Sequence, residues 1–282
     1  MPRPRLTAGR RRMLHWVAVH SLAIAALLCF IGPLFMLVAV SLMTPEESLS
    51  GHLLPEHPQW HNFVDVMRRA GVLRWWFNTL LYAGAATVAT VVSSAPVAYA
   101  LARFDFPGRR AALLLLLTGM MLPPQVTVVP MYILWAKQFH LAGTLWPLIV
   151  PLLFGDAFSI FLLRQFIIAV PRDHIDAARV DGCGELRTML RVVLPMVKPA
   201  LAAVALLQFF LRWNDYFGPQ VYVATNPKWW TLSYGLQTFQ ASEHVEWNLL
   251  TAVNLLVTAP VVLVFFFAQR VFIQGVTLPA AR

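Results

Sequence analysis

The segment His174–Pro199 reads HIDAARVDGCGELRTMLRVVLPMVKP and lies between two long apolar stretches. Four of the 13 acidic residues of the protein lie in it or directly before it: Asp173, Asp176, Asp181 and Glu185. Arginines and a lysine are interleaved with them, although only 12% of the whole chain is charged. A segment with this many charged residues between two apolar stretches indicates a loop that is exposed to water.

The composition of the whole chain is that of a membrane protein. Of its 282 residues, 59% are hydrophobic and the mean hydropathy is +0.64, whereas about a quarter of the residues of a soluble domain are charged. A spanning helix needs roughly 20 mostly apolar residues, and the sequence contains six such stretches: Leu14–Leu42, Trp75–Leu101, Ala111–Trp135, Leu145–Phe166, Pro199–Phe217 and Leu249–Ile273.

The sequence therefore predicts an all-α membrane protein with six transmembrane helices. Residues 1–13 are expected to form a basic N-terminus and residues 14–282 a single transmembrane domain. The first stretch follows Arg10, Arg11 and Arg12, as a signal peptide would. It is much longer than the apolar region of a signal, about 7–15 residues, so it is expected to stay in the mature protein.

The net charge of +9 reflects membrane topology rather than nucleic-acid binding. Lysine and arginine favour the cytoplasmic side of short loops. With both termini and the loop of about residues 171–198 inside, 16 of the 22 basic residues are cytoplasmic. These are Arg3, Arg5, Arg10, Arg11, Arg12, Arg103, Arg109, Arg110, Arg164, Arg172, Arg179, Arg187, Arg191, Lys198, Arg270 and Arg282.

The charged loop has signals for two short helices. Pro171 suits a first helical turn, and Gly182 suits the left-handed position that ends a helix near Asp181. Beyond it, apolar residues recur with the period of an amphipathic helix up to Pro195: Leu186, Met189, Leu190, Val193 and Leu194. Such a pair of helices can dock into a groove on a partner. The alternative is a helix lying on lipid headgroups, against which the acidic residues argue.

The loop resembles a motif of ABC importer permeases. That motif is Glu-Ala-Ala, three residues, Gly, nine residues and Ile-x-Leu-Pro. Here Asp176-Ala177-Ala178 precedes Gly182 by three residues, and nine further residues separate Gly182 from Val192-Val193-Leu194-Pro195. Asp replaces the usual Glu, which shortens the reach of the carboxylate by one methylene, and Val192 replaces Ile.

The resemblance extends over nearly the whole chain and is to the carbohydrate-uptake branch, in particular to the second permease of the heterodimer. The runs that carry it are WFNTL (Trp76–Leu80), YALARFDFPGRR (Tyr99–Arg110), FLLRQF (Phe161–Phe166), RWNDYFGP (Arg212–Pro219), TLSYGLQTF (Thr231–Phe239) and QRVFIQGVT (Gln269–Thr277). The C-terminus, LPAAR, departs from the usual Gly-Ala-Val-Lys type of tail.

The resemblance implies the partners and a role for the loop. It implies a homologous second permease, two ABC ATPase subunits, an extracytoplasmic solute-binding protein, and a place in the bacterial inner membrane. The loop is then a cytoplasmic coupling helix between spans 4 and 5, with these coupling residues: Asp176, Ala177, Ala178, Asp181, Gly182, Leu194 and Pro195. No glycine is followed by lysine, so the chain has no GxxxxGK[ST] phosphate loop. ATP is therefore expected to be used by partner subunits, and this chain is expected to bind no cofactor.

A path for the sugar is harder to assign from sequence. The third stretch contains MLPPQVTVVP (Met121–Pro130), whose prolines predict a broken or bent helix. A broken helix at membrane depth either lines a cavity or is buried in protein. Polar and aromatic residues that could line a pathway are Asn78, Gln125, Asp156, Trp213, Asn214 and Asn254.

Two other classes of function are weighed against an ATP-driven importer. An ion-coupled secondary transporter would need an ionisable residue inside a span, and Asp156 is a candidate. A membrane enzyme or metal site is disfavoured, because none of the eight histidines forms HExxH and no GxSxG occurs. The sequence does not separate a sugar from a polyol or a glycerol phosphate.

Overall fold

The computed structural model describes residues 8–69, 71–240 and 246–276. All regular secondary structure in these ranges is helical, as the sequence predicts. The contacts divide the chain into two units, residues 1–70 with 240–256 and residues 71–239 with 257–282.

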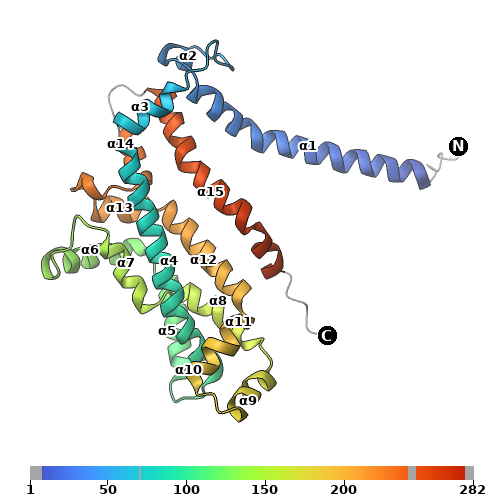
Figure 1. Cartoon of the computed structure of the whole chain (residues 1–282), viewed down its shortest axis with the longest axis vertical. Helices are drawn as coiled ribbons and strands as arrows, with labels where there is room; N and C mark the ends of the chain where they lie inside the picture. Colours follow the sequence, from blue (N-terminus) through green and yellow to red (C-terminus); the bar gives the residue numbers. More distant parts are fainter. Residues whose placement is uncertain (1–7, 70, 241–245, 277–282) are drawn as a thin grey trace. The chain divides into compact units, whose positions relative to one another are not determined.

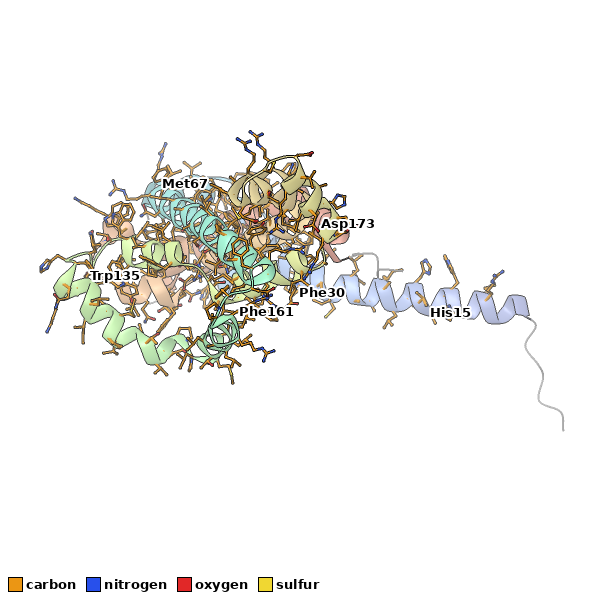
Figure 2. All side chains as sticks on the ribbon, turned by 90° about the horizontal axis from the view of Figure 1, so that it is seen from below. His15, Phe30, Met67, Trp135, Phe161 and Asp173 are labelled. Carbon is orange, nitrogen blue, oxygen red and sulfur yellow. The ribbon has the colours of Figure 1, made fainter. Side chains whose placement is uncertain are left out.

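The first unit consists mainly of one long apolar helix and a small cluster at its end. Its helices are α1 (Ala8–Ser41), α2 (Pro45–Leu49), α3 (His61–Arg69) and the first turns of α15 (Trp247–Val276). Figure 2 shows side chains standing out around α1, and the ring of Phe30 is 78% exposed. In its most apolar window only 6% of residues are buried. So apolar an uncovered helix is suited to lipid rather than to water.

The end of α1 is held by α3. The buried side-chain amide of Asn62 donates to the carbonyls of Ser41 and Met43, both at 2.9 Å. Thr44 then starts α2 with a capping box, in which its hydroxyl accepts from the backbone N–H of Glu47 at 3.2 Å. These contacts satisfy backbone groups that the helix ends leave without partners.

The second unit is built around α4 (Val72–Arg103). Its other helices are α5 (Arg109–Met121), α6 (Pro124–Ile133), η1 (Leu134–Gln138), α7 (Trp146–Ile149), η2 (Val150–Phe154), α8 (Ala157–Ile168), α9 (Arg172–Val180), α10 (Glu185–Thr188), η3 (Met189–Val193), α11 (Leu194–Met196), α12 (Lys198–Trp213), α13 (Phe217–Tyr222), η4 (Pro227–Trp229), α14 (Leu232–Gln240) and the part of α15 from Val257 onward. Figure 1 shows α9 and α10 at one end of α4, with α13 and α14 toward its other end.

Small residues allow α8 and α12 to pack closely on α4. The buried side of α4 contains Ala83, Ala86, Ala89, Ala95 and Ala98, each at most 5% exposed. Small side chains let helix backbones approach each other, which is how apolar helices associate where lipid is as apolar as they are.

The described chain contains four helices that are long and apolar enough to cross a bilayer. They are His15–Ser41, Val72–Arg103, Trp146–Ile168 and Trp247–Phe267. Two bent pairs pass the same test only when joined: Arg109–Met121 with Pro124–Gln138, bent by 94°, and Glu185–Met196 with Lys198–Trp213, bent by 80°. The number of spans is thus between four and six, and the predicted break in the third stretch is confirmed.

Two of the predicted stretches are more interrupted than their hydropathy suggests. The predicted span Leu145–Phe166 changes from α7 through η2 to α8 at Gly155, whose φ is +99°. The predicted span Pro199–Phe217 ends earlier, at Trp213, because the Asp215 carboxylate accepts the backbone N–H of Gly218 at 3.0 Å and a new helix starts there. Hydropathy is an average over many residues, so it does not reveal either of these two breaks.

Reporter fusions test the predicted topology of six spans with both ends cytoplasmic. Fusions at Gly51, Gly108, Gly143, Gly184 and Ala241 are expected to report outside, inside, outside, inside and outside. The reason is the distribution of lysine and arginine, which biases short basic loops to the cytoplasm. Ala241 lies outside the described residues. A fusion at Gly184 that reports the outer side would contradict the cytoplasmic place of the charged loop.

Candidate functional site

The charged loop is anchored to the end of α4 by an arginine. Arg103, the last residue of α4, donates from one guanidinium nitrogen to the carbonyls of Ile167 and Val170, the latter at 2.6 Å. These carbonyls lie at and just after the end of α8, where helical partners run out. The arginine therefore fixes the point at which the chain leaves α8 and enters α9.

α9 turns one side into the protein and the other outward. Ile175 is 3% exposed and packs in a buried cluster with Leu163, Ile167, Met189 and Val193. Of the predicted coupling residues on this helix, Asp176 and Ala177 are exposed, whereas Ala178 is 7% exposed and faces inward. Ala178 thus supports the helix from below, and Asp176, Ala177 and Val180 form its outer surface.

The predicted glycine turn is confirmed. Gly182 has a φ of +79°, the left-handed conformation that glycine adopts without the penalty of a side chain. The N–H of Gly182 donates to the carbonyl of Arg179 at 3.0 Å, and that of Cys183 donates to the carbonyl of Ala178 at 2.9 Å. This is a Schellman motif, which ends α9 and turns the chain toward α10.

A charged cluster braces this turn, and sequence reasoning did not find it. Arg179 donates to Glu185 across the turn at 2.8 Å and reaches Asp176 at 3.5 Å. Tyr99 of α4 donates its hydroxyl to the other oxygen of Glu185 at 2.9 Å. The hydrogen bond to Glu185 is the main cause that raises the pKa of Arg179 above its usual value. The one signal in the sequence was the run Tyr99–Arg110, which the family resemblance singled out.

The second half of the loop differs from the predicted helix. The stripe predicted as one apolar face is divided: Met189 and Val193 are buried, Leu194 is half-buried, and Leu186 and Leu190 are 68% and 52% exposed. The prediction assumed an unbroken α-helix, but Met189–Val193 form the π-helical turn η3, which ends two residues before Pro195. Proline has no N–H to donate, and a π turn changes the number of residues per turn. Leu194 therefore packs inward and Pro195 is exposed.

The outer surface of the loop is therefore partly apolar and partly charged. Val180, Leu186 and Leu190 are 88%, 68% and 52% exposed, and Asp176 and Asp181 are exposed beside them. Figure 2 places Asp173 at the outer edge of the same part of the chain. Exposed leucines next to carboxylates are typical of a surface that a protein partner covers.

The second unit also contains a cleft of about 420 Å³, which lies beside the proline-rich helix α6. Gln125, one of the predicted pathway residues, lines it together with residues of α4, α7 and α13. Its polar wall is formed by Tyr82, Arg212 and Asp215. The Tyr82 hydroxyl donates to the Asp215 carboxylate at 2.6 Å. The proline-rich segment after Met121 thus lines a cavity.

The other predicted pathway residues do not line this cleft, and all except Asn254 form hydrogen bonds within the chain. Asn78 donates to the carbonyls of Lys228 and Trp230, both at 2.9 Å. The indole N–H of Trp213 donates to the carbonyl of Val257 at 3.2 Å. Asn214 is exposed and donates to the carbonyl of Phe210 at 2.9 Å. Asn254 is half-buried in α15, in the first unit.

Asp156 is the N-cap of α8. Its carboxylate accepts from the backbone N–H and the hydroxyl of Ser159 at 2.8 and 2.7 Å, and from the amide of Gln208 at 2.9 Å. Ser94 of α4 accepts the backbone N–H of Asp156 at 3.2 Å. The aspartate thereby joins α4, α8 and α12, an arrangement typical of a helix cap in a packed interior.

Comparison with known proteins gives a consistent result. Residues 94–278 match the family described as binding-protein-dependent transport system inner membrane component. The chain is 31% identical over 275 residues to the arabinooligosaccharides transport system permease protein AraQ of Halalkalibacterium halodurans, covering 96% of this chain and 97% of that protein. It is 31% identical over 255 residues to the diacetylchitobiose uptake system permease protein NgcG of Streptomyces coelicolor, covering 89% of this chain and 84% of the relative.

A solved structure has the same fold. One chain of a bacterial ABC transporter involved in the import of the acidic polysaccharide alginate superposes with a TM-score of 0.79. The two chains are 22% identical, and the match covers 95% of this chain and 99% of that one.

Proposed function

Because this chain belongs to the family of binding-protein-dependent transport system inner membrane components, we propose that it carries an oligosaccharide or a related polyol across the bacterial inner membrane. Its relatives are transport permeases, so the chain is a permease and not an enzyme. The observation that carries the proposal is the loop of residues 171–198. This loop pairs the family motif with a braced, outward-facing helix.

The loop is proposed to dock into an ABC ATPase subunit. Its exposed leucines supply apolar contact area, and the carboxylates beside them supply orientation for a partner with complementary charge. Arg103, Tyr99 and the Arg179–Glu185 pair connect this surface to α4 and α8. A movement of the docked ATPase would therefore be passed to helices of the second unit as a rigid displacement, the kind of motion that alternating access needs.

The rest of the proposed assembly follows from the family. It comprises a homologous second permease, two ATPase subunits and an extracytoplasmic binding protein that delivers the solute. In this scheme the chain itself binds no cofactor. The names of the relatives, which include arabinooligosaccharides and diacetylchitobiose, favour an oligosaccharide as the solute. The cleft beside Gln125 offers amide, hydroxyl and charged groups suited to hydrogen bonds with sugar hydroxyls.

The alternative of an ion-coupled transporter that uses Asp156 is less well supported. An ion-coupling carboxylate must be free to exchange its partner during the cycle. Asp156 instead has Ser159 and Gln208 as hydrogen-bond donors and caps a helix. The structure around it is that of a fixed carboxylate, which favours the ATP-driven scheme.

ATP dependence distinguishes the two schemes. We expect the purified chain alone to hydrolyse no ATP, because it lacks the glycine-rich loop that holds phosphates. After reconstitution with its ATPase, second permease and binding protein, the chain should support uptake of labelled oligosaccharide into proteoliposomes. This uptake should occur only when ATP is present on the side of the membrane that the ATPase faces. A protonophore should leave that uptake unchanged. Uptake without ATP that a protonophore abolishes would contradict the proposal, as would ATP turnover that persists in the repurified chain.

A further inference from the structure

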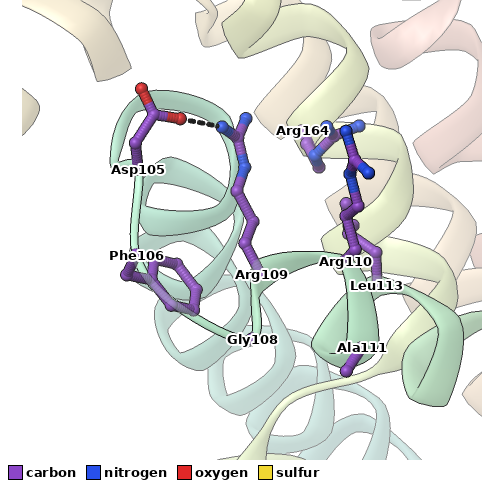
Figure 3. A pocket seen from close by; sticks show the side chains of 8 residues that line it. All are labelled: Asp105, Phe106, Gly108, Arg109, Arg110, Ala111, Leu113 and Arg164. Carbon is purple, nitrogen blue, oxygen red and sulfur yellow. Dashed lines mark hydrogen bonds and ion pairs between the residues drawn. The ribbon is translucent and has the colours of Figure 1, made fainter.

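A basic pocket lies where α4, α5 and α8 meet. Its volume is about 750 Å³, and Arg109, Arg110 and Arg164 line it together with the single carboxylate Asp105. Figure 3 shows the three arginine side chains extending toward the same end of the pocket, while Gly108 and Ala111 lie at its other end. The cleft beside Gln125 contains none of these residues, and of them only Asp105 also lines a pocket with residues of the charged loop.

The pocket has more positive charge than its own carboxylate can balance. Arg109 pairs with Asp105 at 2.5 Å and also donates to the carbonyl of Leu101 at 3.0 Å. Arg164 donates from Nε to the same carbonyl at 3.1 Å. Arg110 forms no hydrogen bond or ion pair within residues 8–69, 71–240 and 246–276. Three guanidinium groups thus meet one carboxylate, and the charge that remains is suited to an anion.

The place of the pocket restricts the source of that anion. The turn from Phe104 to Gly108 connects two apolar helices, α4 and α5, and therefore lies at a membrane surface. Next to the pocket, Leu114 and Leu115 of α5 are 64% and 73% exposed. A charged pocket at headgroup depth beside apolar helix surface matches the two parts of a phospholipid. In addition, the N-terminus of α5 opens at Gly108 with no side-chain cap, and a helix N-terminus favours a negative group.

We propose that this pocket binds the phosphate group of an anionic membrane phospholipid. Arg110 and Arg164 donate to the phosphate oxygens, with the planar fork that makes arginine a good phosphate ligand. Arg109, held by Asp105 and Leu101, adds charge without moving. The acyl chains lie along the exposed leucines of α5. The proposal requires only that the chain lies in a bilayer, so it stands independently of the transported solute.

Native mass spectrometry of the full chain in mild detergent tests the site. The probes are phosphatidylglycerol and phosphatidylcholine with the same acyl chains, and inorganic phosphate. We expect phosphatidylglycerol to bind about tenfold more tightly than phosphatidylcholine, and Arg110→Ala to weaken it by about tenfold, the effect of one lost hydrogen bond to a charged group. Arg110 has no partner within the described chain, so its removal should not disturb folding.

Arg74→Ala is the matched control. Arg74 is an exposed arginine near the start of α4, the end of that helix away from the pocket. The Arg74→Ala substitution should leave phosphatidylglycerol binding unchanged. Arg164→Gln, which removes a charge that α8 contributes to the pocket, should weaken binding as Arg110→Ala does. Equal binding of the two lipids, or equal loss in the Arg74→Ala control, would overturn the proposal. Displacement of phosphatidylglycerol by an equal concentration of inorganic phosphate would assign the pocket to free phosphate instead.

Discussion

We expect Gly182→Val to lower oligosaccharide uptake at least about tenfold while the amount of the chain in the membrane stays the same. A residue with a side chain in the left-handed conformation costs about 1–2 kcal/mol, and a β-branched one costs more. Gly182 has a φ of +79°, and no atom lies within 4 Å of where its Cβ would be. The effect is therefore conformational and not steric. A change of one or two kcal/mol shifts an equilibrium about 5–30-fold. Here the shift is away from the turn conformation that sets the direction of α10.

The measurement is uptake alongside co-purification of the ATPase, at matched membrane levels. Gly184 gives a matched control, because it also has open space around its Cβ position but has an ordinary φ of −69°. Gly182→Ser should therefore impair uptake, whereas Gly184→Ser, with the same side chain two residues away, should not. If Gly182→Val transports at the parent rate and holds its ATPase normally, the loop is not the coupling element.

The second large effect is expected at Gly235, where an added methyl group should destabilise the second unit. Gly235 lies in α14, and a Cβ built on it would overlap the six-membered ring of Trp75 in α4. Trp75 is 7% exposed, and its indole cannot bend away as the end of a flexible chain could. Forcing an extra group into a packed site costs about 1–3 kcal/mol. We therefore expect Gly235→Ala to lower the thermal unfolding temperature of the purified chain.

Gly119→Ala separates this packing effect from helix propensity. Gly119 lies in α5, and nothing is within 4 Å of its Cβ position. Alanine favours a helix over glycine by about 1 kcal/mol, so this control should keep or raise the unfolding temperature. Combining Gly235→Ala with Trp75→Leu should recover part of the lost stability, because the effects of substitutions at two residues in contact are not additive. A Gly235→Ala protein that unfolds at the parent temperature would show that the two helices do not pack as described.

Much of the charged loop, residues 171–198, was predictable because its conformation depends on local backbone chemistry. The glycine at position 182 ends a helix and proline at position 195 interrupts one, whatever lies around them. The break after Met121 follows in the same way from consecutive prolines. The distinction between apolar stretches and a charged loop requires only composition and length. For the same reason the sequence indicated a family, since its motif is a spacing of local signals.

What only the tertiary structure decided are the contacts between residues far apart in the chain. Tyr99 and Glu185 are 86 residues apart, and Arg103 and Val170 are 67 apart, yet each pair forms a hydrogen bond at the base of the loop. No periodicity signals such pairs. Asp156 looked like an isolated carboxylate in a span until Gln208, 52 residues away, was found donating to it. Gly235 was one glycine among 14 until Trp75 was found against it. A local pattern determines the conformation of a segment, but which side chains meet depends on how the segments pack.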